Sequence, residues 1–265
     1  MTYFARFYHL PLASGSRPTP RSFDLRVRAD GEGHDFADGG IRLRDVTVRY
    51  GRRIALEAVS GEFASGSLTA VVGANGAGKS TLLAAIAGVK RLAGGVVNGP
   101  ARQRLAYLPQ LAAIDREYPL TVSELITLGA WREFGAFRSP GTALRARAAA
   151  VAETVGLAGR LARPIGEISV GELQRALFAR LILQDAAAIL LDEPFTAVDA
   201  QTMSVLLDQV VRWHREGRTV IAVLHDLDLV QARFPSTVVL ARRCVAWGAT
   251  EAVLPAMVAR CRRMR

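Results

Sequence analysis

The segment "GANGAGKST", residues 73–81, constrains the fold of this chain more than any other stretch. It has the pattern G-x-x-x-x-G-K-S, whose fixed positions hold Gly73, Gly78, Lys79 and Ser80. A short apolar run, residues 68–72, leads into it, and residues 80–88 have the composition of a helix. Glycines let a loop between a strand and a helix turn tightly, so that its N–H groups point at phosphate oxygens. The segment therefore predicts a phosphate-binding loop between a buried strand and a helix.

A nucleotide bound by this loop is expected to contact all of its residues, which are Gly73, Ala74, Asn75, Gly76, Ala77, Gly78, Lys79, Ser80 and Thr81. Lys79 is expected to reach the β and γ phosphates, and the Ser80 hydroxyl is expected to ligate Mg²⁺. The chain has 34 lysines and arginines, of which only Lys79 and Lys90 are lysines, so composition alone rarely places a lysine here. The alternative is a chance glycine-rich turn, which the flanking strand and helix argue against.

A second apolar run, "AAAILLDEP" at residues 186–194, ends in two carboxylates. In α/β proteins the ligand site lies at the carboxyl ends of the strands, which is where Asp192 and Glu193 are expected. Asp192 is predicted to hold Mg²⁺ through water, and Glu193 is predicted to orient and deprotonate an attacking water. The alternative is a polar exit from the strand into a turn at Pro194.

The segment "ISVGELQR", residues 168–175, is similar to the signature LSGGQ-x-Q-R of ATP-binding-cassette (ABC) ATPases. The matching residues are Ser169, Gly171, Gln174 and Arg175, and the departures are Ile168, Val170 and Glu172. The resemblance implies that Ser169 and Gly171 contact the γ-phosphate of ATP bound by the opposite subunit. Ser169 and Glu172 also form the S-x-x-E pattern of a capping box, so a plain amphipathic helix is the alternative. Glu172 would place a negative charge near a phosphate unless the cap holds it aside.

Other residues match further motifs of the ABC ATPases, and the resemblance covers residues 41–250. It implies that Tyr50 stacks on adenine, that Gln110 touches Mg²⁺ and senses a membrane partner, and that Asp199 lies at the subunit interface. It also implies that His225 lies near the γ-phosphate, so Glu193, His225 and Gln110 are the expected catalytic residues. The expected Mg²⁺ ligands are Ser80, Gln110 and Asp192. Structural alternatives are a core aromatic for Tyr50 and a polar turn residue for Gln110.

The expected fold is therefore α/β, a P-loop NTPase with a mostly parallel sheet, an antiparallel β subdomain and a helical subdomain near residues 112–170. The antiparallel part is expected to contain residues 41–50, with a bulge where the alternation slips at Arg44 and Asp45, and residues 54–63. Residues 1–40 are expected to be a flexible N-terminal extension, with a folded arm as the alternative. Residues 251–265 are expected to be a basic C-terminal tail.

Composition and charge limit the partners of the chain. Its net charge of +10 comes from scattered arginines that do not alternate with aromatics, so no nucleic-acid partner is expected. The longest apolar run is about six residues where a membrane span needs roughly 20. The two cysteines, Cys244 and Cys261, predict neither a disulfide framework nor a metal site. The resemblance then implies a homodimer on the cytoplasmic face of the plasma membrane, held there by a separate permease and served indirectly by a substrate-binding protein.

The transported substrate is suggested by the wording of "IDREYPLTVSELITLGAWREFG", residues 114–135, and "LHDLDLVQARFP", residues 224–235. Both resemble the ATPases of zinc and manganese uptake systems, with zinc ranked first, although siderophore and cobalamin importers share the T-V-x-E-L part. Two alternatives stay open. One is the ATPase of an iron-chelate or cobalamin importer or of an exporter, and the other is a soluble ABC protein acting on DNA or the ribosome.

Overall fold

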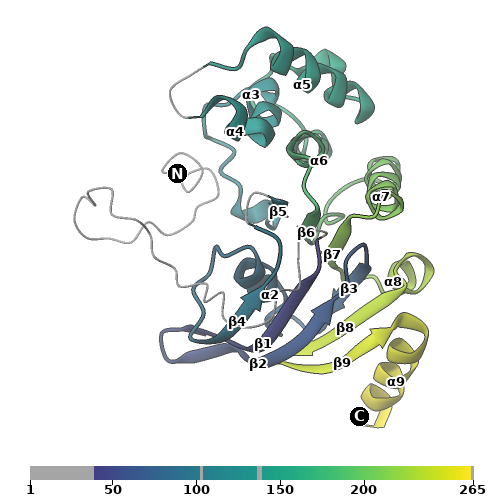
Figure 1. Ribbon diagram of the computed structural model, residues 1–265. Helices are drawn as coiled ribbons and strands as arrows, with labels where there is room; N and C mark the ends of the chain where they lie inside the picture. The colour runs from purple at the N-terminus through teal and green to yellow at the C-terminus, as the bar shows by residue number, and fades with distance from the viewer. Residues whose placement is uncertain (1–38, 102–103, 136–138, 264–265) are drawn as a thin grey trace, which may run out of the picture.

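A six-stranded sheet forms the centre of the molecule, which the computed structural model describes over residues 39–101, 104–135 and 139–263 (Figure 1). The strand order is β5-β6-β7-β3-β8-β9, and all neighbours are parallel except β8 and β9. The strands are β3 (Leu68–Val72), β5 (Leu105–Leu108), β6 (Ala188–Asp192), β7 (Thr219–Val223), β8 (Ser236–Ala241) and β9 (Arg243–Ala249). Every residue of β3, β6 and β7 is buried, as expected for parallel strands covered on both faces. The predicted α/β class is confirmed.

A separate antiparallel sheet lies below the central one, with the order β2-β1-β4 (Figure 1). Its strands are β1 (Ile41–Tyr50), β2 (Arg53–Phe63) and β4 (Gly94–Asn98). The register of β1 on β2 shifts between Leu43 and Val46, and Asp45 has a φ of 49°, so the bulge predicted at this point is confirmed. Trp247 of β9 packs on Phe63 and covers Gly61, which joins the two sheets.

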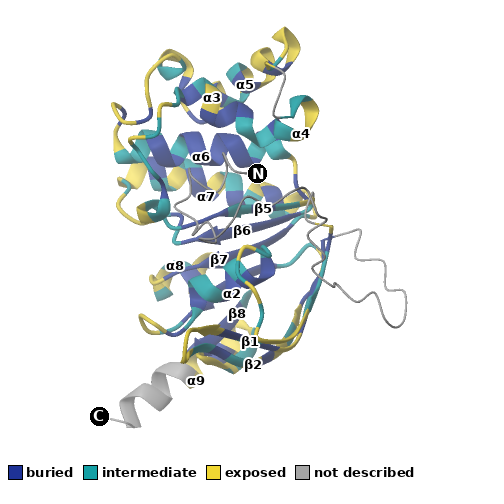
Figure 2. Ribbon diagram, turned by 90° about the vertical axis from the view of Figure 1, so that its left-hand side faces the viewer, coloured by how far each residue is buried: buried dark blue, intermediate teal, exposed yellow. Residues whose placement is uncertain are grey.

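Some helices of the described residues cover the central sheet, and others pack on those helices. The helices are α2 (Lys79–Ile86), α3 (Val122–Thr127), α4 (Trp131–Phe134), α5 (Thr142–Thr154), α6 (Val170–Gln184), α7 (Ala200–Arg215), α8 (Leu227–Arg233) and α9 (Thr250–Arg263), with short 3₁₀ turns η3 (Leu111–Ala113), η4 (Leu128–Ala130) and η5 (Ala158–Arg160). We call α3 to α6 the helical layer, which stands at the top of Figure 1. Figure 2 shows that α6 and the central strands are buried between the outer elements. One continuous hydrophobic cluster joins the helical layer to the sheet.

The two ends of the chain were expected to be a flexible extension, residues 1–40, and a basic tail, residues 251–265. The predicted N-terminal extension, residues 1–40, lies outside the described residues except for Gly39 and Gly40. The C-terminal residues expected to form a basic tail lie in helix α9 as far as Arg263. Among the described residues, no helix is both long and apolar enough to cross a lipid bilayer.

Candidate functional site

The glycine loop lies between β3 and α2, as predicted from its sequence. Gly78 is the N-cap of α2 with a φ of 97°, and a Cβ there would come within 2.6 Å of the Ala55 carbonyl oxygen. A Cβ on Gly73 would overlap the carbonyl oxygen of Leu240. Both positions therefore need glycine, because the loop packs tightly against β2 on one side and β8 on the other.

Lys79 is 5% exposed and folds back over the loop. Its Nζ donates to the carbonyl oxygens of Gly73 at 2.9 Å and Ala74 at 3.1 Å. Burial lowers the pKa of Lys79, and the nearby carboxylates of Glu193 and Asp192 oppose that shift. The ammonium is thus held at the loop by backbone carbonyls alone, which phosphate oxygens can replace as acceptors.

Three oxygen-bearing side chains converge beside Lys79. Ser80 Oγ donates to Asp192 Oδ1 at 3.0 Å, and Gln110 Nε2 lies 3.2 Å from Ser80 Oγ. Asp192 is 2% exposed, and burial, with a smaller contribution from the charge of Glu193, raises its pKa to about 6. Hydroxyl, carboxylate and amide oxygens are the ligands that Mg²⁺ prefers, and a buried carboxylate is stabilised by a divalent cation. The donor set therefore fits Mg²⁺.

Glu193 lies one residue beyond the end of β6 with a φ of 52°. Its Oε1 accepts a hydrogen bond from Gln110 Nε2 at 2.8 Å and lies 2.7 Å from Nε2 of His225. β6 and β7 are parallel neighbours, so Glu193 and His225, which both follow strand ends, meet at one edge of the sheet. Glu193 therefore contacts both of the other side chains predicted to act in catalysis.

These groups line one cleft of about 650 Å³. Ten predicted residues line it, namely Tyr50, Asn75, Gly76, Gly78, Lys79, Ser80, Thr81, Gln110, Glu193 and His225. Gly73, Ala74 and Ala77 complete the loop behind them, and Asp192 reaches the cleft through its bond to Ser80. Sequence reasoning missed two lining residues, Arg53 and Ala55. The two-residue turn after Tyr50, which pairs Tyr50 with Arg53, is the signal that could have found Arg53.

Three predicted residues, Ser169, Gly171 and Asp199, do not line this cleft and form a second group. Ser169 is the N-cap of α6, and the predicted capping box with Glu172 is present. Asp199 is the N-cap of α7, where Thr202 N–H donates to its Oδ1 at 2.7 Å and holds its pKa below the usual range. A Cβ on Gly171 would lie 3.5 Å from Asp199 Oδ2, so the two helix starts are neighbours.

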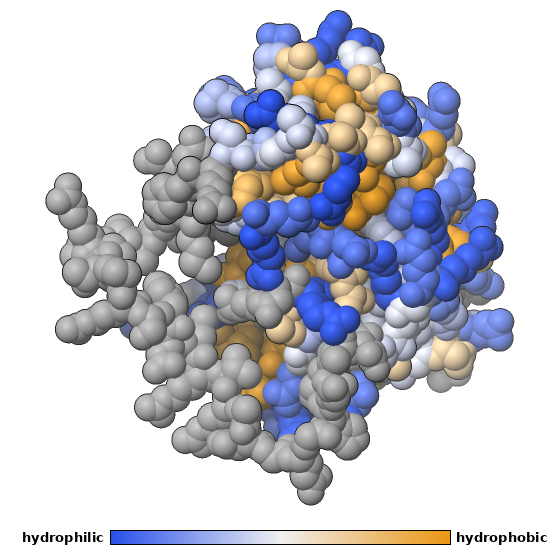
Figure 3. Space-filling model, turned by 45° about the horizontal axis from the view of Figure 1, so that its top comes forward, coloured by the Kyte–Doolittle hydropathy of each residue, from blue (hydrophilic) through white to orange (hydrophobic). Residues whose placement is uncertain are grey.

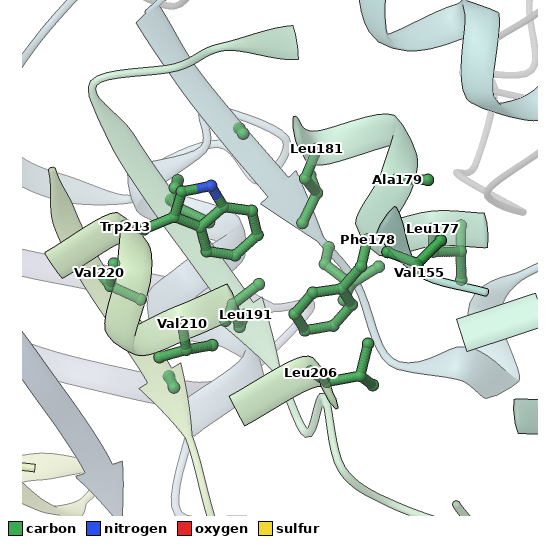
Figure 4. Packing of buried hydrophobic residues seen from close by; sticks show 14 of the residues in the cluster. Val155, Leu177, Phe178, Ala179, Leu181, Leu191, Leu206, Val210, Trp213 and Val220 are labelled. Atoms are coloured by element: carbon green, nitrogen blue, oxygen red, sulfur yellow. The ribbon is translucent and has the colours of Figure 1, made fainter. Parts of the chain in front are cut away.

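Packing between α6 and α7 holds these two helix starts at a fixed spacing. Phe178 of α6 stacks on Trp213 of α7 with ring centroids 5.7 Å apart and an angle of 15° between the rings. Figure 4 shows both rings among Leu181, Leu191, Leu206 and Val210. This close packing resists independent movement of the two helices.

Glu172, the acidic departure in the signature, is held aside by two contacts. Ser169 N–H donates to its Oε2 at 2.8 Å, and Nε of Arg160 donates to its Oε1 at 2.7 Å. The Ser169 backbone N–H first, and then Arg160, lower the pKa of Glu172, so the carboxylate is ionised but neutralised. The capping box thus holds the Glu172 carboxylate aside, which is the condition that the sequence analysis named. The contact with Arg160 was not predicted.

A hydrogen-bonded seam joins residues 116–123 to residues 161–168, directly before the signature helix. Its hydrogen bonds include Arg116 Nη2 to the Ile168 carbonyl and three backbone bonds, each 2.9 Å long, from Val122 N–H to the Arg163 carbonyl, Ser123 N–H to the Leu161 carbonyl and Ile165 N–H to the Leu120 carbonyl. A shift of either segment therefore carries the other with it.

Comparison with known proteins supports this picture. Residues 56–196 match the sequence profile of the ABC transporter family. The chain is 34% identical over 217 residues to the manganese transport system ATP-binding protein MntB of Listeria monocytogenes, covering 80% of this chain and 90% of that protein. It is 37% identical over 215 residues to the zinc transport system ATP-binding protein TroB of Treponema pallidum, covering 79% and 81%. A crystal structure of a nucleotide-free ATP-binding cassette from an ABC transporter has the same fold, with a TM-score of 0.69, 21% identity, and coverage of 83% and 95%.

Proposed function

The chain belongs to the ABC transporter family of ATP-binding proteins, and from this premise we propose that it is the ATP-hydrolysing subunit of an importer for a divalent transition metal. The observation that carries the proposal is the single cleft in which the glycine loop meets Gln110, Glu193 and His225. The manganese and zinc transport functions of similar proteins support the choice of cargo.

In the proposed reaction Glu193 accepts a proton from the water that attacks the γ-phosphate of ATP. His225 and Gln110 both contact Oε1 of Glu193, so they fix the direction of its carboxylate. Oε2, which accepts only a long hydrogen bond of 3.5 Å from the Thr196 hydroxyl, is the oxygen proposed to take the proton. Lys79 exchanges its two loop carbonyls for phosphate oxygens and neutralises charge that develops there. Tyr50 lies at the mouth of the cleft and supplies an aromatic face for the adenine.

Ser80, Asp192 and Gln110 would hold Mg²⁺ with the nucleotide. Bound there, the ion would neutralise negative charge on the nucleotide phosphates. The Ser80 hydroxyl and the Asp192 carboxylate already share a hydrogen bond, so the two groups are oriented for a common ligand before it arrives.

We further propose that two copies of the chain form a dimer around two ATP molecules. Ser169, Gly171 and Asp199 do not line the cleft of their own chain. Ser169 and Gly171 lie at the N-terminus of α6, which suits a phosphate, and Asp199 caps the neighbouring helix α7. A second copy can present this group to the nucleotide in the cleft of the first. In such a dimer each chain contributes its cleft to one ATP and its Ser169 helix start to the other.

The permease is proposed to bind the segment from Gln110 to Leu128. Leu111, Tyr118, Leu120 and Leu128 are only partly buried and pack against the core from this segment. Figure 3 shows apolar side chains set among charged ones on the side of the molecule that carries the helical layer. An apolar centre with a polar rim is typical of a protein–protein interface. Such a contact would hold the chain at the cytoplasmic face of the membrane.

The cargo is proposed to be zinc ahead of manganese, because the sequence of residues 114–135, in the segment proposed to meet the permease, resembles the ATPases of zinc and manganese uptake systems. Relatives of both kinds have similar identity, so the order of the two metals stays a prediction. Zinc and manganese are distinguished by ligands in a permease and in a binding protein, not by an ATPase.

The test is deletion of the gene, with complementation by the wild type or by Glu193→Gln, in medium where chelator removes one metal at a time. Failure to grow under zinc limitation, restored by the wild type and by excess zinc but not by Glu193→Gln, supports the proposal. A defect under manganese limitation alone reverses the order of the metals. Normal growth under both, with a defect on an iron chelate or cobalamin, contradicts metal import.

A further inference from the structure

Arg53 places a guanidinium at the mouth of the nucleotide cleft. It begins β2 and pairs with Tyr50 across a turn of only two residues, so both side chains stand at the same end of the hairpin. Both line the cleft. Nη2 of Arg53 lies 3.8 Å from the position that a Cβ on Gly76 would occupy, which puts the guanidinium against the phosphate-binding loop.

Among the positively charged side chains that line the cleft, that of Arg53 is the one without a bonding partner in the described residues. Three lining residues can carry positive charge, and two of them are engaged, Lys79 with loop carbonyls and His225 with Glu193. The Arg53 side chain has neither a hydrogen bond nor an ion pair with any residue in the described part of the chain. Its five N–H donors are therefore available to a ligand.

The neighbouring contacts indicate which part of the nucleotide these donors meet. Nζ of Lys90 lies 3.7 Å from the centroid of the Tyr50 ring, so the aromatic platform already has a cation against it. Arg53 points instead toward Gly76, in the loop whose N–H groups are shaped for phosphates. A planar guanidinium matches two phosphate oxygens at once.

We infer that Arg53 is a nucleotide-binding residue that contacts the polyphosphate of ATP, an inference that rests on the proposed nucleotide function of the cleft. The contact is expected equally in the bound ground state and in the transition state, because Arg53 lies against Gly76 of the loop and its side chain forms no hydrogen bond with the proposed base, Glu193. Such uniform binding lowers the KM for ATP and leaves kcat unchanged.

The experiment uses the purified full-length chain with Mg²⁺ and compares Arg53→Ala and Arg53→Lys with the wild type. Arg52→Ala is the matched control, because Arg52 is the adjacent arginine of the same turn, is exposed and does not line the cleft. Dissociation constants are measured by calorimetry for ATP, ADP and adenosine, and the melting temperature of each variant reports folding.

We expect Arg53→Ala to weaken ATP and ADP about tenfold, which corresponds to 1.4 kcal/mol, and to raise the KM without changing kcat. Adenosine binding and the Arg52→Ala variant stay within about twofold of the wild type, and Arg53→Lys recovers part of the loss.

Three results overturn the inference. They are unchanged ATP binding by Arg53→Ala, an equal loss for adenosine, which would place the contact on the base, and an equal loss in Arg52→Ala, which would indicate a general effect of net charge. The wild type is titrated with ATP before the variants. If it does not bind ATP, both the proposed function and this inference are contradicted.

Discussion

Asp192 is a carboxylate that the fold buries at a cost. Burial raises its pKa to about 6 from an ordinary value of 3.8, so the folded chain binds this proton more tightly than the unfolded chain does. The stability linked to this proton is complete below pH 3.8 and is lost as the pH rises through about 6. We therefore expect Asp192→Asn to raise the free energy of unfolding of the nucleotide-free protein at pH 8, by at most about 3 kcal/mol.

Urea denaturation of both proteins at pH 5 and pH 8, without nucleotide or divalent cation, measures this effect. The gain from Asp192→Asn is expected to shrink at pH 5, where the wild-type side chain is largely protonated. Adding Mg²⁺ and ATP should stabilise the wild type and not the variant. An equal difference between the two proteins at both pH values would contradict the assigned titration.

At the residue scale, the sequence predicted side chains that belong to fixed motifs and missed those that depend on contacts between segments. Lys79, Asp192 and His225 follow strand ends or occupy loop positions that a pattern specifies, and the structure brings them to one place. Arg53 reaches the cleft through a hairpin register. Arg160 meets Glu172 from a turn 12 residues earlier, and no local pattern encodes that approach.

Helices α3 and α6 both begin with a capping box, so the same substitution can be compared at the two helix starts. Thr121 and Glu124 cap α3 in the segment proposed to meet the permease, and Ser169 and Glu172 cap α6. We expect Thr121→Ala and Ser169→Ala each to cost about 1 kcal/mol of stability, because each loses one cap acceptor. Chemical denaturation of the two variants checks this equality.

Their functional effects should differ despite the similar loss of stability. Ser169→Ala is expected to slow ATP hydrolysis by the purified chain, whereas Thr121→Ala keeps that activity and weakens metal uptake in cells. Equal losses of hydrolysis in both variants would mean that the helix start at Ser169 acts only through stability.

At the element scale, caps were easier to predict than strand ends. The capping box at the start of α6 was predicted from the S-x-x-E pattern and is present, and α3 begins with the equivalent T-x-x-E pattern at Thr121. The strand expected over residues 186–194 is shorter, Ala188–Asp192, because Glu193 takes a left-handed backbone that ends the ladder. An apolar run shows where a strand lies, but hydrogen bonding decides where it stops.

The two sheets of the molecule are joined where Gly61 of β2 lies under Trp247 of β9. A Cβ at Gly61 would overlap the indole ring, so Gly61→Ala forces the sheets apart. We expect a loss of about 1–3 kcal/mol in stability, typical of overpacking. The KM for ATP should also rise, because β2 carries Arg53 to the cleft. Gly159→Ala, at an exposed site with open space, is the control, and an unchanged KM in Gly61→Ala would contradict this coupling.

The proposed dimer is tested at the scale of the whole molecule. Glu193→Gln keeps the shape of the side chain and removes the base, so hydrolysis should slow about 10²–10⁴-fold while ATP still binds. The variant is then expected to elute as a dimer with ATP and as a monomer with ADP in size-exclusion chromatography. Hydrolysis at the wild-type rate would show that Glu193 is not the base.

The seam between residues 116–123 and residues 161–168 links the segment proposed to meet the permease to the start of the Ser169 helix. Any coupling that it carries must be reciprocal. If a conformation of the permease raises the affinity of the Ser169 helix for nucleotide, then nucleotide raises the affinity of the chain for that conformation by the same factor. If the chain works with a permease as proposed, a few hydrogen bonds would make the transported substrate a thermodynamic effector of a nucleotide that it never touches.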